Sequence, residues 1–287
     1  MQPRRCFGAW LYRSLAALLA AAAPAATAAQ PQRVVSLDLC TDQLLLELAP
    51  RQHIAAVTHL AGDASVSAIP DQARGIPITH GAAEDVLRYD PDLILAGPFG
   101  VAATIDLLRR LQRHLVVVPL AQDLDGVRRS VRVVAQALGE EARGAAMLAE
   151  FERRLAAVAS APGAVAPSAV IYQVGGIVSG PGSLADAVLT AAGFRNLARD
   201  YRLARNGRVP LELLLAQPPD LLLLANRSGD YPTPAADNLR HPALGRRQQA
   251  SLELPWQLWL CGTPHVAEAI ERLAAWKRRF SAVEPRP

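Results

Sequence analysis

The chain has 287 residues, of which 30 are basic and 26 are acidic. Three of the basic residues, Arg4, Arg5 and Arg13, precede residue 30, so the rest of the chain carries nearly balanced charge. No basic stripe with interleaved aromatic residues is present, which excludes a typical nucleic-acid-binding surface. We therefore expect no nucleic-acid partner.

Residues 1–29 have the pattern of a secretory signal peptide. The three arginines precede an apolar run at 15–23, and residues 26–28 offer an Ala-x-Ala cleavage site. The run is too short and too rich in alanine for a typical membrane span. We expect cleavage and export to the periplasm by the general secretory route, with the twin-arginine route as the alternative. No cysteine directly follows the run, so we expect no lipid anchor.

The next part of the chain alternates strands and helices. The expected elements are a strand at 33–38, a helix at 42–48, a strand at 54–58, a loop-rich stretch at 61–80, a helix at 82–89, a strand at 93–96, a helix at 102–112 and a strand at 114–119. This order is typical of a parallel sheet flanked by helices.

Two helices follow, at 124–138 and 140–159, and the second would be about 30 Å long at 1.5 Å per residue. A turn-rich stretch at 160–167 then precedes a second alternation of elements. Its expected members are a strand at 168–174, a helix at 184–192, a helix at 211–217, strands at 221–225 and 250–254, and a helix at 264–280. Because the long helix lies between the two alternations, we interpret it as a connecting helix.

Two segments 128 residues apart have nearly the same pattern, AEDVLRYDPDLILAG at 83–97 and LELLLAQPPDLLLLAN at 211–226. In each, Glu84 or Glu212 is followed seven residues later by Pro and eight later by Asp. Proline ends a helix, and the continuous apolar run that follows suits a strand covered on both faces. The repeat predicts two similar lobes, each with an exposed acid. The alternative for either Glu is an ordinary first-turn acid that the helix dipole favours.

Motifs of catalytic chemistry are missing from the sequence. It has no nucleotide-binding loop, Gly-x-Ser-x-Gly elbow or His-Glu-x-x-His helix. Gly175-Gly176 and the glycines at 180 and 182 lack dinucleotide-binding spacing, so we interpret them as loops beside a strand end. The six histidines are scattered singly, and the sequence leaves open whether any of them binds a metal. We expect a protein that is not an enzyme.

Cys40 and Cys261 are the only cysteines after residue 29. Each is expected in a loop that follows a strand, where open α/β sheets bind ligands. Three interpretations stay open: unrelated thiols, a disulfide formed in an oxidising compartment, or participation in ligand or metal binding. Trp256 and Trp259 lie near Cys261 and are either core residues or a ligand-stacking wall.

Together, the signal-like N-terminus, RVVSLDLCTDQLLLEL at 33–48, both repeat segments and the long middle helix resemble periplasmic binding proteins of importers for iron-siderophores, haem and cobalamin. The resemblance covers residues 33–280. It implies an α/β fold of two lobes with parallel central sheets flanked by helices, joined by one long rigid α-helix, with the ligand cleft between the lobes. It also implies a monomer that delivers its ligand to an ABC permease dimer with a cytoplasmic ATPase.

The resemblance divides the chain into four parts. These are a signal peptide at 1–29, an N-terminal lobe at 30–139, a connecting helix at 140–160 and a C-terminal lobe at 161–287. Glu84 and Glu212 would be the residues that dock on the permease.

The transported ligand is expected to be a metal chelate, with a ferric siderophore first, haem second and cobalamin third, and no intrinsic cofactor. The cobalamin-binding relative has an Asp and an Arg before the last helix, whereas Gln257 and Cys261 stand near those positions here. His59 and His80 could ligate iron or be ordinary polar loop residues.

The arginine guanidinium can donate two parallel hydrogen bonds to an anionic chelate. The second lobe has four such arginines, at 202, 205, 208 and 227. The candidate cleft residues are Asp38, Cys40, Thr41, His59, His80, Phe99, Gln173, Arg208, Arg227, Trp256, Gln257, Trp259 and Cys261. Two rival functions stay open: an exported α/β hydrolase, and a ligand-binding or signalling module of the same fold without a transport role.

Overall fold

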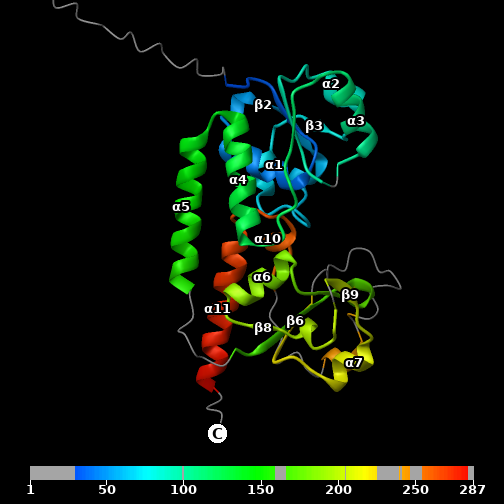
Figure 1. Cartoon of the computed structure of the whole chain (residues 1–287), viewed down its shortest axis with the longest axis vertical. Coiled ribbons are helices and arrows are strands. Elements are labelled where there is room, and N and C mark those ends of the chain that lie inside the picture. Colours follow the sequence, from blue (N-terminus) through cyan, green and yellow to red (C-terminus); the bar gives the residue numbers. More distant parts are fainter. Residues whose placement is uncertain are drawn as a thin grey trace, which may run out of the picture.

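The computed structural model describes residues 30–98, 100–158, 166–203, 205–224, 239, 241–245 and 254–283. The expected signal peptide, Phe99, Arg227 and most of the strand expected at 250–254 lie outside these residues. The described part forms an α/β fold with two five-stranded sheets flanked by helices (Figure 1). None of its helices combines the length and the apolar character needed to cross a membrane.

The first sheet is parallel throughout and has the order β3-β2-β1-β4-β5. Its strands are β1 (Val34–Ser36), β2 (Ile54–Thr58), β3 (Ile78–Thr79), β4 (Leu93–Ala96) and β5 (Leu115–Val117). From β1 the chain builds the sheet in one direction through β2 and β3, then in the other through β4 and β5. The neighbouring β1 and β4 therefore form the topological switch point, beside which such sheets bind ligands.

Helices cover this sheet, and we call the sheet and these helices the first lobe. They are α1 (Leu39–Leu48), α2 (Ala83–Leu87), α3 (Ala102–Arg110) and α4 (Leu124–Leu138). Helix α1 begins three residues earlier than predicted, because the Asp38 side chain caps it by accepting the backbone N–H of Cys40.

The second sheet is mixed, so the prediction of two parallel sheets is wrong for this half of the chain. Its strands are β6 (Ser168–Tyr172), β7 (Ile177–Ser179), β8 (Arg195–Asn196), β9 (Asn206–Arg208) and β10 (Leu221–Leu224). Strand β6 pairs in parallel with β8 and β10, whereas β7 runs antiparallel to both β6 and β9. Gly175 and Gly176, with φ of 72° and 75°, form the tight turn that sends β7 back along β6.

The second lobe consists of this sheet with its own helices. They are α6 (Leu184–Ala191), α7 (Leu211–Ala216), α9 (Pro242–Gly245), α10 (Gln257–Leu260) and α11 (Val266–Val283). Helix α11 corresponds to the predicted last helix, and α10 and the 3-10 turns were not predicted.

Helix α5 (Glu141–Val158) lies beside α4 along one part of its length and beside α11 along another (Figure 1). Met147 and Leu148 pack against the core of the first lobe, whereas Phe151 belongs to the core of the second lobe. Helix α4 is divided in the same way, since Val127 lies in the second core and Val131 in the first. Two helices, α4 and α5, thus contribute to both cores.

The two repeat segments adopt matching structures. In the first, α2 precedes β4, which pairs in parallel with β1. In the second, α7 precedes β10, which pairs in parallel with β6. Glu84 and Glu212 lie in the first turns of α2 and α7, and both are exposed.

Candidate functional site

The C-terminal edge of the first sheet meets the second lobe. Behind β2, the backbone carbonyls of Ala64 and Ser65 accept hydrogen bonds from Gln257 Nε2 and Trp256 Nε1, each at 2.8 Å. Behind β5, a side chain at Gly262 would collide with Ala121. We call this edge, together with residues 254–265, the inter-lobe face.

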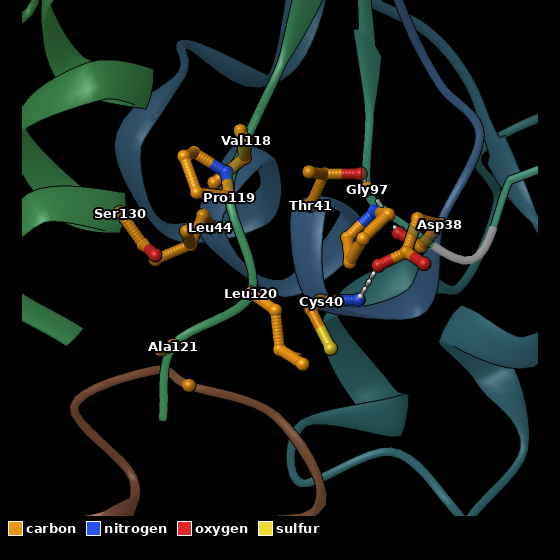
Figure 2. Close-up of a pocket in the computed structure, with 12 residues that line it drawn as sticks. Asp38, Cys40, Thr41, Leu44, Gly97, Val118, Pro119, Leu120, Ala121 and Ser130 are labelled. Carbon is orange, nitrogen blue, oxygen red and sulfur yellow. Dashed lines mark hydrogen bonds between the residues drawn. The ribbon is translucent and has the colours of Figure 1, made fainter. Parts of the chain in front are cut away.

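A small cavity opens on the inter-lobe face beside the switch point (Figure 2). Asp38 and Cys40 line it from behind β1, Gly97 from behind β4, and Leu120 from behind β5, while Gly262 comes from the second lobe. Its volume of about 20 Å³ holds about one water molecule. A metal chelate is far larger, so this cavity can be only a part of a chelate-binding site.

Asp38 is the charged group of the cavity. Its Oδ1 accepts the N–H of Cys40 at 2.9 Å, and a side chain at Gly97 would collide with its carboxylate. Burial raises the pKa of Asp38, and the N–H groups of Cys40 and Thr41 oppose that rise. Gly97 thus leaves the room that this carboxylate needs at the switch point.

Cys40 and Cys261 are joined in a disulfide, with an S–S distance of 2.18 Å and a Cα–Cα distance of 5.1 Å. The bond links the start of α1 to the inter-lobe segment of the second lobe, 221 residues away in sequence. Cys261 follows the short helix α10 rather than the predicted strand. In the bonded form neither sulfur is a thiolate that could ligate a metal.

His59 and His80 stack on each other, with ring centroids 5.7 Å apart and ring planes at 19°. They follow β2 and β3, so they lie at the same sheet edge as Asp38, and both are exposed. Neutral imidazole is a ligand of iron, cobalt and other transition metals. Among the described residues no group of three or more His, Cys, Asp or Glu is arranged to hold a resident metal ion.

The two tryptophans have different surroundings. Trp256 and its neighbour Gln257 hydrogen-bond across to the first lobe, so they brace the two lobes. Trp259 is only 9% exposed and packs in the core of the second lobe, which fits the core interpretation.

The remaining candidates are spread over both lobes. Thr41 is buried and its hydroxyl donates to the Asp38 carbonyl at 2.9 Å. Gln173 follows β6 and its Nε2 donates to Ser179 Oγ at 3.0 Å. Arg208 lies exposed in β9 of the second sheet.

The structure therefore brings together Asp38, Cys40, Thr41 and Cys261, and it pairs His59 with His80. Sequence reasoning missed Gly97, Leu120 and Gly262, which line the same cavity. Gly97 and Gly262 matter because they lack a side chain, and a sequence does not show where a side chain would collide. Leu120 is not distinguished from the other leucines by any sequence pattern. The position of Gly262 directly after Cys261 was the one available signal.

The family model for periplasmic binding proteins matches residues 34–248 of the chain. The chain belongs to the periplasmic binding protein family. The family resemblance of the sequence is thereby confirmed, and the family is one of binding proteins rather than enzymes.

Relatives share the fold at low identity. A cobalamin-binding protein of Halobacterium salinarum is 28% identical over 198 residues, 68% of this chain and 54% of that protein. The chain thus matches about half the length of this relative. The apo periplasmic heme-binding protein of Roseiflexus sp. RS-1 has a TM-score of 0.70 at 22% identity, over 85% of this chain and 98% of that one. An ABC-type Fe3+-hydroxamate transport protein of Saccharomonospora viridis has a TM-score of 0.66 at 23% identity, over 86% and 93%. At these identities the structures show a shared fold only.

Proposed function

We propose that this periplasmic binding protein is the substrate-binding component of an ABC importer and captures a metal-bearing macrocycle of the haem type between its lobes. The observation that carries the proposal is the stacked pair of exposed imidazoles, His59 and His80, on the inter-lobe face. A haem-type macrocycle holds its metal in the ring plane and leaves axial positions open, and imidazole is a common axial ligand. A ferric siderophore surrounds its iron with its own oxygen atoms, so an imidazole of the protein has little access to that iron as a ligand.

His80 is the better candidate for the axial ligand. Its side chain is 77% exposed, and its Nδ1 lies 3.8 Å from Asp85 Oδ2. Nε2 is the ring nitrogen away from this carboxylate, so it is the atom we propose as the metal ligand. Because the two rings stack on each other, His59 would support His80 and not bind the metal from the opposite side.

Exposed apolar residues on the inter-lobe face suit the flat faces of a macrocycle. Leu120 lines the cavity from the first lobe and is 46% exposed (Figure 2). Leu260 directly precedes the disulfide-bonded Cys261 in the second lobe and is 37% exposed. Ligand sites are typically apolar with a few polar groups that fix orientation.

Titration with haemin tests the proposal. The wild-type protein should bind it and give the absorbance spectrum of imidazole-ligated haem. His80→Ala should lose that spectrum and weaken binding at least about tenfold, the cost of a lost interaction worth about 1.4 kcal/mol. His114→Ala is the matched control, because His114 is exposed but precedes β5 at the opposite sheet edge. Absence of haemin binding, or an unchanged spectrum in both His59→Ala and His80→Ala, would contradict the proposal.

A ferric siderophore is the second candidate, because exposed arginines gather before and within β9. Arg202, Arg205 and Arg208 are all exposed and could fork onto an anionic chelate. A siderophore that binds wild-type protein and fails to bind the Arg205→Ala, Arg208→Ala double variant would favour this candidate over haem. Cobalamin is the third ligand to test.

Delivery would use the two exposed repeat acids. Glu84 and Glu212 occupy equivalent positions in the two repeats, and we propose that they dock on the two halves of a membrane permease. Helix α5 would serve as the rigid connecting helix, because its side chains pack into both cores. The proposed division of the chain stays 1–29 for the signal peptide, 30–139 and 161–287 for the lobes, and 140–160 for the connection.

A further inference from the structure

Beneath the disulfide, one face of α1 meets the segment before α11. Cys40, Gln43 and Glu47 are spaced three and four residues apart, so they lie on one side of the helix. At one end Cys40 is bonded to Cys261, and at the other Glu47 Oε1 lies 3.2 Å from His265 Nε2. Along the chain, Gln43 lies between the two contacts on the helix and Thr263 lies between them on the opposite segment. We call Gln43, Glu47, Thr263 and His265 the polar joint.

Several polar atoms of the polar joint are buried without hydrogen-bond partners among the described residues. Gln43 is 0% exposed and Thr263 is 1% exposed. Among the described residues, neither amide atom of Gln43 nor the hydroxyl of Thr263 has a hydrogen-bond partner. The same holds for Glu47 Oε2, whereas His265 Nε2 lies 3.2 Å from Glu47 Oε1 without the geometry of a hydrogen bond. Each buried group without a partner costs about 1–3 kcal/mol relative to its hydrated state. Opening the joint to water would recover this free energy.

The two sulfurs at the end of the joint differ in access. Cys40 is partly exposed and lines the small cavity on the inter-lobe face (Figure 2). Cys261 is 1% exposed and is not among the residues that line this cavity. A thiol that approaches from solvent therefore reaches Cys40 before Cys261.

We propose that the Cys40–Cys261 bond is a redox latch on the polar joint, opened by a dithiol reductant that attacks Cys40. The first reductant thiolate bonds to Cys40 Sγ and displaces Cys261, which takes up a proton. The second reductant thiol then displaces Cys40, which also takes up a proton, and the reductant leaves as a disulfide. Two electrons and two protons pass to the protein, and the polar joint takes up water.

The entry point is tested by trapping. Folded wild-type protein is treated with a small monothiol, free thiols are alkylated, and peptides are identified by mass spectrometry. The mixed disulfide should form on Cys40, with Cys261 recovered alkylated, in at least about tenfold excess over the reverse. Equal amounts, or an excess on Cys261, would overturn the assignment of Cys40.

The joint itself is tested by amide hydrogen exchange on folded protein before and after reduction with a dithiol. Exchange should rise at least about tenfold in residues 40–48 and 257–265, with little change in β4 and β10. The Cys40→Ala, Cys261→Ala double variant should show the same pattern without reductant. No change, or an equal rise throughout both cores, would overturn the latch.

The role of the unpartnered polar atoms is tested by replacing them with apolar groups of similar shape. In the Gln43→Met, Thr263→Val variant, reduction should raise exchange at the joint less than threefold, because little is gained from water. Thr104→Val is the matched control: its hydroxyl is buried but donates to the Gly81 carbonyl at 2.8 Å. The control should keep the full reduction-dependent rise. A full rise in the Met/Val variant as well would overturn the polar explanation.

Discussion

The two repeat segments occupy equivalent places in two sheets that are built differently. In the first lobe Asp92 accepts the backbone N–H groups of Gln32 and Arg33, at 2.7 and 2.9 Å, just before β1. In the second lobe Asp220 accepts the N–H and the hydroxyl of Ser168, both at 2.7 Å, at the start of β6. In both lobes the aspartate of the repeat thus fixes the start of the neighbouring parallel strand.

Beyond this shared unit the lobes diverge. The first sheet continues in parallel on both sides of β1, whereas β6 is followed by a glycine turn and the antiparallel strands β7 and β9. A repeated segment of about 15 residues therefore encodes a local helix-turn-strand unit and its first neighbour. The rest of each sheet depends on residues outside the repeat.

The buried carboxylates of the lobes differ too. In the second lobe Asp186 is paired with Arg199 at 3.1 Å and with Asn196 at 3.0 Å. In the first lobe Asp42 is 0% exposed and accepts the N–H and the hydroxyl of Thr58. Among the described residues Asp42 has no ion pair, and burial raises its pKa to about 6.

The largest expected effect concerns the acids that the repeats share. Removing both charges, in Glu84→Gln with Glu212→Gln, should lower chelate uptake into vesicles that hold the cognate permease by about 100-fold. This estimate takes about 1.4 kcal/mol, or tenfold, for each lost contact. Haemin affinity should stay within about twofold of the wild type.

Glu141→Gln is the matched control, since Glu141 is also an exposed first-turn acid, on α5. It should leave uptake unchanged. Loss of haemin binding in the double variant would contradict the proposed docking role of Glu84 and Glu212. Equal uptake by the wild type, the double variant and Glu141→Gln would contradict it too.

The mixed sheet should be more sensitive to an added methyl group than the loops of the first lobe. A Cβ at Gly180, just after β7, would overlap the carbonyl oxygen of Arg205 near β9. We expect Gly180→Ala to lower the free energy of unfolding by about 3 kcal/mol or more. Gly62→Ala, which has open space around the new group, should cost far less. Chemical denaturation measures both, and similar values would contradict the packing explanation.

The burial of Asp42 predicts that the free energy of unfolding depends on pH. The Asp42 pKa of about 6 exceeds the ordinary value of 3.8, so the folded state holds the proton more tightly than the unfolded state. Asp42 therefore stabilises the folded state most below pH ~4. This contribution falls by about 3 kcal/mol as the pH rises from ~4 to ~6, and it is constant above that. Asp42→Asn should remove this decline when unfolding is measured between pH 4 and 7. A decline of unchanged size in the variant would exclude Asp42 as its source.

The smallest expected effect compares the two strand-fixing aspartates. Asp220→Ala and Asp92→Ala should each lower the free energy of unfolding by about 1–3 kcal/mol. The Asp220→Ala substitution should lower the free energy of unfolding more, because the hydrogen bond of Asp220 with Ser168 is partly buried. The hydrogen bonds of Asp92 go to exposed backbone N–H groups. Thermal or chemical denaturation would show this order, and the reverse order would contradict the burial argument.

The sequence predicted the units that depend on local pattern. The helix-turn-strand repeat, strands β1, β2, β4 and β5 of the first sheet and the last helix follow from proline, apolar runs and helical spacing, and the structure has them. It did not predict strands β3, β7, β8 and β9, which are two or three residues long. Such short strands depend on pairing with neighbouring strands, and no local pattern marks them.

The candidate site was predictable in part for the same reason. Asp38 and Cys40 follow the first strand, and that position alone indicated the ligand-binding edge. The stacking of His59 on His80 needs the pairing of β2 with β3, and β3 was hidden in a stretch interpreted as loop. The polar joint depends on contacts between residues more than 200 positions apart, which sequence spacing does not reveal.

Native mass spectrometry with absorbance spectroscopy, on protein purified from the cells that make it, tests the central claim most directly. We predict one metal-bearing macrocycle per chain, with a spectrum that changes in His80→Ala and not in His114→Ala. A metal-free organic ligand, or a chelate whose spectrum is the same in all three proteins, would contradict the account.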